Sequence, residues 1–135
     1  MVEYTSTLEG FQRAMKWSLT GPAEESQLYA EATSTPDFYH LMNNQRIPYG
    51  AFIKGIEEWR GGKTSDYEPV VHEFLRDGDQ LATRMTGTIR VDGVDTEFES
   101  FMFGKVDKQS GKLEYLIERS VWGPVGGAPE HGVNT

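Results

Sequence analysis

The feature that most constrains the fold is a series of hairpin signals in the second half of the chain. Asp77-Gly78 and Asp92-Gly93 each separate two apolar runs, and an Asp-Gly pair in that position is the strongest short-range hairpin signal. A polar segment at 107–111 has the composition of a longer turn. The runs between these turns, rich in β-branched and aromatic residues, are residues 67–75, 80–91, 96–106 and 113–122. The pattern predicts a four-stranded antiparallel meander.

The first half of the chain has helical rather than alternating periodicity. Thr5 or Thr7 can cap a helix that continues to about residue 19, with apolar side chains at helical spacing. Pro22 precedes a second predicted helix over about 23–32, and Pro48 a third over about 49–59.

A short strand is predicted at residues 38–42, followed by a polar turn at 43–46. Helices therefore come first and antiparallel strands later, an order typical of the α+β class. We expect a curved antiparallel sheet, made of the short strand and the meander, to wrap on the three N-terminal helices. The result would be a cone with one pocket.

Composition narrows the function classes. At 135 residues we expect one domain over 1–135, with a core at about 5–122 and an irregular tail at 123–135. A net charge of −8 argues against a nucleic-acid partner, and the absence of cysteine excludes disulfides and thiolate nucleophiles. Without a leader or a run of 18 apolar residues, we expect a cytoplasmic protein that has no membrane partner.

Four segments of the chain resemble the nuclear transport factor 2-like superfamily: residues 36–40, 50–59, 77–88 and 111–118. This cone-shaped fold includes ketosteroid isomerase, scytalone dehydratase, limonene epoxide hydrolase and the SnoaL-type polyketide cyclases. The last two segments are similar to the third and last strands of SnoaL-like members. The resemblance implies the fold and leaves the reaction open, because the superfamily also contains ligand binders and assembly modules.

Glu118 is the first candidate for acid/base chemistry. It lies in the middle of the last predicted strand, where a lone buried carboxylate is costly, and relatives commonly point an acid into the cone at this place. Burial would raise its pKa toward the working pH, which suits proton transfer. The alternative is a structural ion pair with Arg84 or Arg119.

Arg84 and two histidines are further candidates. If strand alternation holds, Arg84 shares a face with Ala82 and Thr86 and could pair with Glu118 or hold an anionic substrate group. The epoxide hydrolase pattern has an Asp two residues after the Arg, where this chain has Thr86, so epoxide opening is the weaker reading. His40 and His72 could face the same pocket as acid/base groups, or be structural.

The remaining candidates are a phenol and an apolar lining. Tyr49, which precedes the third helix, is the best placed of Tyr39, Tyr49 and Tyr115 to donate a hydrogen bond, although packing is the commoner role. The expected substrate-binding residues are Phe11, Met15, Trp17, Phe52, Trp59 and Met102. Scattered histidines give no metal-ligand spacing and no phosphate loop occurs, so we expect no metal and no cofactor.

These observations predict an enzyme of lyase or isomerase type. It would carry out elimination, dehydration, isomerisation or cyclisation on a small apolar substrate, aromatic or polycyclic. A non-catalytic ligand-binding or dimerisation module of the same fold remains the alternative. By resemblance to the superfamily we also expect a homodimer through the outer sheet face, involving Phe101, Phe103, Ile117 and Val121.

Overall fold

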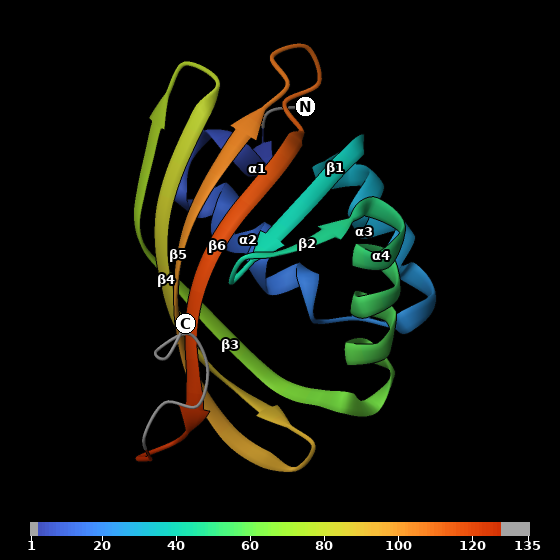
Figure 1. Cartoon of the computed structure of the whole chain (residues 1–135), viewed down its shortest axis with the longest axis vertical. Coiled ribbons are helices and arrows are strands. Elements are labelled where there is room, and N and C mark those ends of the chain that lie inside the picture. Colours follow the sequence, from blue (N-terminus) through green and yellow to red (C-terminus); the bar gives the residue numbers. More distant parts are fainter. Residues whose placement is uncertain (1–2, 128–135) are drawn as a thin grey trace.

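The computed structural model describes residues 3–127 and has the predicted α+β architecture, a curved sheet with helices packed on its concave side (Figure 1). The helical elements are α1 (Glu3–Ser6), α2 (Leu8–Ser18), η1 (Ala23–Glu25), α3 (Ser26–Thr33), α4 (Tyr49–Glu58) and η2 (Trp59–Lys63). The strands are β1 (Ser34–Met42), β2 (Gln45–Pro48), β3 (Thr64–Asp77), β4 (Gln80–Val91), β5 (Val94–Val106) and β6 (Leu113–Pro124).

Within residues 3–127 the strands form one six-stranded sheet in the order β2-β1-β6-β5-β4-β3. The predicted meander β3-β4-β5-β6 is confirmed, and each pair in it is antiparallel. The sheet is nevertheless mixed, because β1 pairs with β6 in parallel. This one parallel pairing brings the first half of the chain beside the last strand.

The turn after β1 is tighter than the sequence indicated. Only Asn43 and Asn44 form it, with φ angles of 46° and 72°, and residues 45–48 then form strand β2 against β1. Asparagine tolerates this left-handed backbone better than most residues, which suits it to a two-residue hairpin turn. The predicted polar turn at 43–46 is therefore wrong in its second half.

The predicted N-cap of the first helix is present, and the second predicted helix is divided in two. Thr7 caps α2 by accepting a hydrogen bond from the Gly10 backbone N at 3.0 Å. The second predicted helix is divided into the 3-10 turn η1 and the helix α3. After α4 the chain leaves the helix through η2, where Gly62 has a φ of 129° that favours glycine.

The core lies between the helices and the concave face of the sheet. Phe11 and Met15 of α2 pack there with side chains that alternate along the strands, such as Leu81, Met85 and Met102. The opposite set of side chains on each strand faces outward, and it leaves Phe101 51% and Phe103 63% exposed. The concave face is therefore where any enclosed site must lie.

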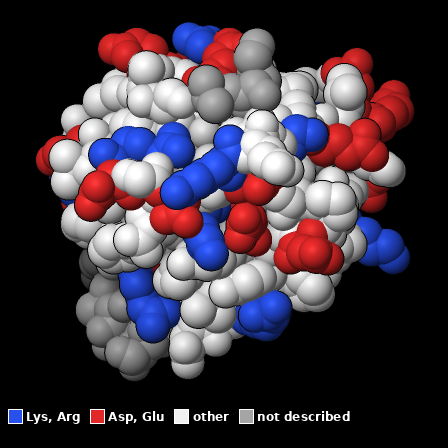
Figure 2. All heavy atoms as spheres, turned by 90° about the horizontal axis from the view of Figure 1, so that it is seen from above, with Lys and Arg blue, Asp and Glu red and all other residues white. Residues whose placement is uncertain are grey.

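The surface charges are dispersed. On the face seen in Figure 2, acidic and basic side chains lie among one another rather than in patches of one sign. Several are paired on the outer face of the sheet, where Arg84 contacts both Glu73 and Glu99 at 2.9 and 2.8 Å. Within residues 3–127 no helix has the length and apolar character needed to cross a membrane.

Candidate active-site pocket

A cavity of about 280 Å³ lies between the helices and the concave face of the sheet. Its walls are mainly apolar and aromatic, with side chains that include Met15, Phe52, Trp59, Phe98, Met102 and Trp122. Ligand sites are usually apolar clefts of this kind with a few polar groups, at volumes of roughly 300–1,000 Å³. The cavity therefore suits a small organic molecule.

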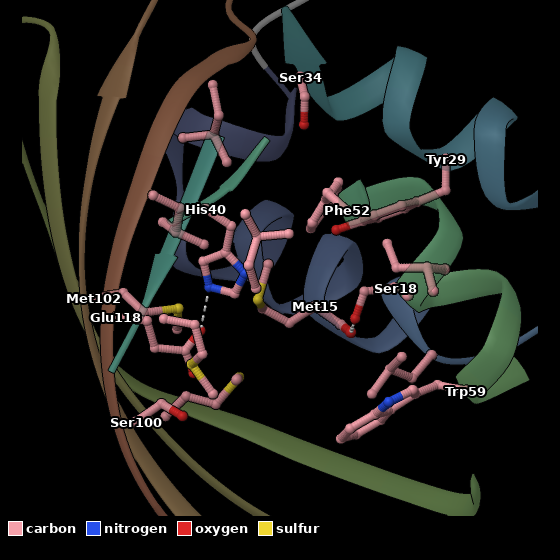
Figure 3. A pocket seen from close by; sticks show the side chains of 18 of the residues that line it. Met15, Ser18, Tyr29, Ser34, His40, Phe52, Trp59, Ser100, Met102 and Glu118 are labelled. Atoms are coloured by element: carbon pink, nitrogen blue, oxygen red, sulfur yellow. Dashed lines mark hydrogen bonds and ion pairs between the residues drawn. The ribbon is translucent and has the colours of Figure 1, made fainter. Parts of the chain in front are cut away.

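His40 and Glu118 are a hydrogen-bonded pair in the cavity wall. They come from β1 and β6, whose parallel register sets Met42 opposite Glu118. The His40 Nε2 atom lies 2.8 Å from Glu118 Oε1, as the dashed line in Figure 3 shows. Both side chains are largely buried and both line the cavity, so two residues 78 positions apart form one polar unit in an apolar chamber.

The second oxygen of Glu118 is also hydrogen-bonded. The Ser120 hydroxyl donates to Glu118 Oε2 at 2.5 Å, and Ser120 Oγ is in turn 2.6 Å from the Ser100 hydroxyl. Both serines are buried on the inward side of β5 and β6. The carboxylate is thus held from two directions, which fixes its orientation.

The protonation state of Glu118 differs from the sequence-based expectation. Burial alone would raise the pKa of its carboxyl, but the hydrogen bond and charge of His40, with the Ser120 and Ser100 hydroxyls, lower the pKa below its usual value. The expectation of a raised pKa is wrong because these partners outweigh desolvation. Glu118 is therefore a carboxylate at neutral pH.

This carboxylate determines which nitrogen of His40 is free. A carboxylate only accepts hydrogen bonds, so Nε2 carries the hydrogen, and in the neutral ring Nδ1 then has a lone pair. Nδ1 makes no hydrogen bond with residues 3–127, and every fully buried side-chain nitrogen or oxygen in that range has a partner. Nδ1 is therefore accessible from the cavity that His40 lines.

Two of the predicted polar residues lie outside the cavity. The expectation that Arg84 faces the pocket is wrong. The side chains of β4 that point inward are those of Leu81, Thr83 and Met85. Arg84 points outward and forms ion pairs with Glu73 and Glu99. The pocket position expected for His72 is also wrong. It lies exposed on β3, where its Nε2 is 2.6 Å from Thr86 Oγ1.

Some of the residues predicted to donate a phenol or to bind the substrate line the cavity, and the others do not. Met15, Phe52, Trp59 and Met102 line the cavity as expected. Three others are not among the lining residues: Tyr49 is partly buried at the start of α4, Phe11 packs on Phe74, and Trp17 packs on Tyr29. Burial and the nearby Glu31 raise the pKa of Tyr49, so it is a neutral phenol. His131 lies outside the described residues.

Sequence reasoning missed several polar groups of the cavity: the hydroxyl-bearing residues Ser18, Tyr29, Ser34, Tyr67 and Ser100. Tyr67 begins a predicted strand. Its inward orientation could have been predicted only by knowing which of the two alternating faces of that strand is buried. Tyr29 lies on α3, where nothing in the local pattern distinguishes a cavity residue from a core residue. Among residues 3–127, no three His, Asp or Glu side chains come together as a metal site.

Comparison with known proteins gives structural similarity without sequence similarity. No family model matches the chain, and no curated protein sequence matches it. An LEH-like epoxide hydrolase of M. tuberculosis superimposes with a TM-score of 0.60 at 17% identity, covering 79% of each chain. PrhC from Penicillium brasilianum gives 0.65 at 12% identity, covering 80% of this chain and 75% of that one.

A SnoaL-like polyketide cyclase candidate from Shewanella denitrificans gives a TM-score of 0.64 at 10% identity. The match covers 81% of this chain and 88% of that one. At these identities the similarity concerns the fold, and the chemistry must be argued from the side chains described above.

Proposed function

This chain has the cone fold of the nuclear transport factor 2-like superfamily, and from that fold and its pocket we propose that it is a small-molecule enzyme of acid/base type. The observation that carries the proposal is the His40–Glu118 pair in the wall of an otherwise mainly apolar cavity. A buried carboxylate is costly unless it is well partnered, and buried carboxylates with a specific partner are concentrated at functional sites.

In the proposed mechanism, His40 Nδ1 removes a proton from a carbon of the substrate. The electron pair of the broken C–H bond forms a new double bond. Either a leaving group on the next carbon departs with its bonding pair, or an adjacent double bond shifts and its far atom takes the proton back. The first outcome is an elimination or dehydration, and the second an isomerisation or a step of a cyclisation. The chemistry uses protein groups alone and needs no cofactor.

Glu118 supports this step through His40. Its carboxylate holds the hydrogen on Nε2, orients the ring, and stabilises the imidazolium that forms when Nδ1 takes a proton. This differs from the sequence-based hypothesis, in which Glu118 itself was the leading base or acid. A carboxylate of lowered pKa is a weak base, whereas an accessible imidazole nitrogen matches the task better.

Two features of the cavity support a neutral, apolar substrate of limited size. Apolar and aromatic side chains supply most of its walls, and the one carboxylate there is already paired. An apolar cavity of roughly 150 Å³ is enough to hold benzene. A volume of about 280 Å³ therefore favours one or two rings over a larger polycyclic molecule.

The test uses 5-nitrobenzisoxazole, a small aromatic compound that opens when a base takes its ring C–H proton. The C–H electrons form a nitrile, the N–O bond breaks, and a coloured phenolate is released. We expect the wild-type protein to accelerate this reaction and His40→Asn to lower the rate by about 100-fold or more. Glu118→Gln should also lower it, because the imidazolium loses its partner.

His72→Asn is the matched control, since it removes a histidine from the exposed outer face. Its rate should equal that of the wild type. If His40→Asn also equals the wild type, the proposed mechanism is wrong. Binding of the compound without acceleration would instead favour the alternative of a non-catalytic ligand-binding module. The outer-face position of Arg84 argues against epoxide hydrolysis, which by resemblance would use an arginine in the pocket.

Two further expectations from the sequence stay proposals. We propose that the protein is cytoplasmic and that it forms a homodimer through the outer face of the sheet, where Phe101 and Phe103 are exposed side chains of β5. A dimer of this kind would leave the cavity of each protomer free, because the cavity lies on the concave side of the sheet.

A further inference from the structure

The two serines beside Glu118 form an oriented chain of hydrogen bonds. Ser120 has one hydroxyl hydrogen and donates it to Glu118 Oε2 at 2.5 Å, because a carboxylate can only accept. In the 2.6 Å contact between Ser100 Oγ and Ser120 Oγ, the donor is therefore Ser100. Every hydrogen of the chain points toward Glu118, from Ser100 through Ser120 to the carboxylate.

The open end of this chain is the oxygen of Ser100. Its hydrogen is committed toward Ser120, and no side chain within residues 3–127 donates a hydrogen bond to Ser100 Oγ. Ser100 and Ser120 are equally buried, but only Ser100 lines the cavity. In Figure 3 it lies on the sheet side of the cavity, next to Glu118. Ser100 Oγ therefore has lone pairs left for a ligand in the cavity.

The charge of Glu118 makes Ser100 a better acceptor than an isolated serine. Hydrogen bonds in a chain polarise one another, and those that end on a charged group are the stronger ones. The hydroxyls of Ser100 and Ser120 both lower the pKa of Glu118, so the carboxylate acts on both of them. A hydroxyl that already donates toward an anion carries more negative charge on its oxygen. A ligand that donates to Ser100 would extend the chain by one hydrogen bond.

The other hydroxyls of the cavity wall have also committed their hydrogens. Ser18 donates to a backbone oxygen of its own helix at 2.6 Å, so the phenols of Tyr29 and Tyr67, which are hydrogen-bonded to it, donate to its oxygen. Ser34 Oγ lies 3.3 Å from Thr33 Oγ1, whose own hydrogen goes to the Tyr29 backbone O, so Ser34 is the donor there. The hydroxyls of the wall therefore favour a ligand that brings its own hydrogen.

We propose that Ser100 accepts a hydrogen bond from a hydroxyl group of the ligand, so that the substrate class is a small apolar alcohol of one or two rings. The proposal deepens the acid/base function proposed above, and its catalytic meaning rests on that function. A hydroxyl held in this way donates its hydrogen and receives none from Ser100, so it is not helped to leave. It anchors the substrate beside the His40–Glu118 pair and stays on the product.

The test uses titration calorimetry with three ligands that share one ring skeleton. They are 2-indanol, which has a hydroxyl donor, 2-indanone, whose oxygen can only accept, and indane, which has no oxygen. We expect the wild-type protein to bind 2-indanol about tenfold more tightly than 2-indanone, the ratio that roughly one good hydrogen bond supplies. Ser100→Ala should reduce this ratio toward one. Its affinity for indane should stay unchanged, which shows that the cavity is intact.

Ser26→Ala is the matched control, because Ser26 is a fully buried serine that is not among the cavity-lining residues, and it should keep the wild-type ratio. The proposal is overturned if the wild type does not prefer the alcohol, if it binds none of the three ligands, or if Ser100→Ala keeps the full ratio. A ratio that His40→Asn abolishes and Ser100→Ala retains would place the ligand hydroxyl on His40 and would overturn it too.

This subsite and the proposed function can fail separately. A tenfold preference for the alcohol in a protein that does not accelerate the opening of 5-nitrobenzisoxazole would reject the proposed function and leave the Ser100 subsite standing. Acceleration that depends on His40, combined with a ratio of one, would reject the subsite and leave the function.

Discussion

The side chain of Asn43 holds both backbone groups of Ser120. Its amide oxygen accepts from the Ser120 N at 2.9 Å, and its amide nitrogen donates to the Ser120 O at 3.1 Å. The Asn43 backbone N also donates to the Glu118 O at 2.9 Å. The turn after β1 is thereby attached to the segment of β6 that carries the cavity carboxylate.

Replacing Asn43 with glycine should test this attachment cleanly. Glycine accepts the φ of 46° without strain, so the substitution removes the two side-chain hydrogen bonds and keeps the turn. At about 0.5–1.5 kcal/mol for each hydrogen bond, we expect the free energy of unfolding in urea to fall by about 1–3 kcal/mol. A change below about 0.5 kcal/mol would mean that the turn is held by the backbone pairing alone.

The stability of the fold should depend on the ionisation of Glu118 with a definite sign. Its pKa is lower in the folded protein than in the unfolded chain, where a glutamate titrates near about 4.3. The carboxylate therefore contributes stability that is fully present above about pH 5 and is lost as the pH falls through the folded pKa. Glu118→Gln lacks this titration.

The measurement is the difference in unfolding free energy between wild type and Glu118→Gln, taken from pH 7 down to pH 3. We expect the advantage of the wild type to be constant near neutral pH and to shrink in the acid range. An advantage that grows as the pH falls would show that burial outweighs the hydrogen bonds from His40 and Ser120, and that the pKa of the carboxyl is raised, as the sequence first suggested.

Local sequence signals predicted the strands well because turn chemistry fixes their ends. The Asp-Gly pairs at 77–78 and 92–93 define both ends of β4. Strand β2 carried no comparable signal: it has four residues, ends in Pro48, and exists only because β1 offers it an edge. Its pairing is a tertiary effect.

The site was harder to predict because alternation tells which residues share a face, but not which face is covered. The outward position of Arg84 could have been predicted, because Leu81, Met85 and Ile89 make the other face of the same strand apolar. The positions of Tyr67 and His72 could not have been predicted in this way. Register shifts between Ser65 and Glu68 and between Val71 and Glu73 change which side chains of β3 share a face.

Two helical glycines should respond to alanine with opposite signs. A Cβ on Gly10 of α2 would lie 1.7 Å from the Glu3 backbone O, so α1 would have to move. A Cβ on Gly55 of α4 would meet nothing within 4 Å. We expect Gly10→Ala to lower the unfolding free energy by about 1–3 kcal/mol through overpacking.

Gly55→Ala should instead raise the unfolding free energy by about 1 kcal/mol, because alanine is the better helix former. Urea unfolding of both variants under one condition is the measurement. If both substitutions stabilise the protein, α1 moves away from α2 at little cost and the close approach of Gly10 to Glu3 does not limit stability.

The last prediction follows from the proposed homodimer. Phe101 and Phe103 lie on the outer face of β5 with 51% and 63% of their surface exposed, and a second copy would cover them. A charge placed there would be buried in the dimer without a partner, at a cost of several kcal/mol. We expect light scattering at micromolar concentration to give a dimer for the wild type and a monomer for Phe103→Glu. Val94→Glu, at an exposed apolar position beside the β4–β5 turn, should remain dimeric. A monomeric wild type would reject the dimer, and equal behaviour of the two variants would place its interface elsewhere.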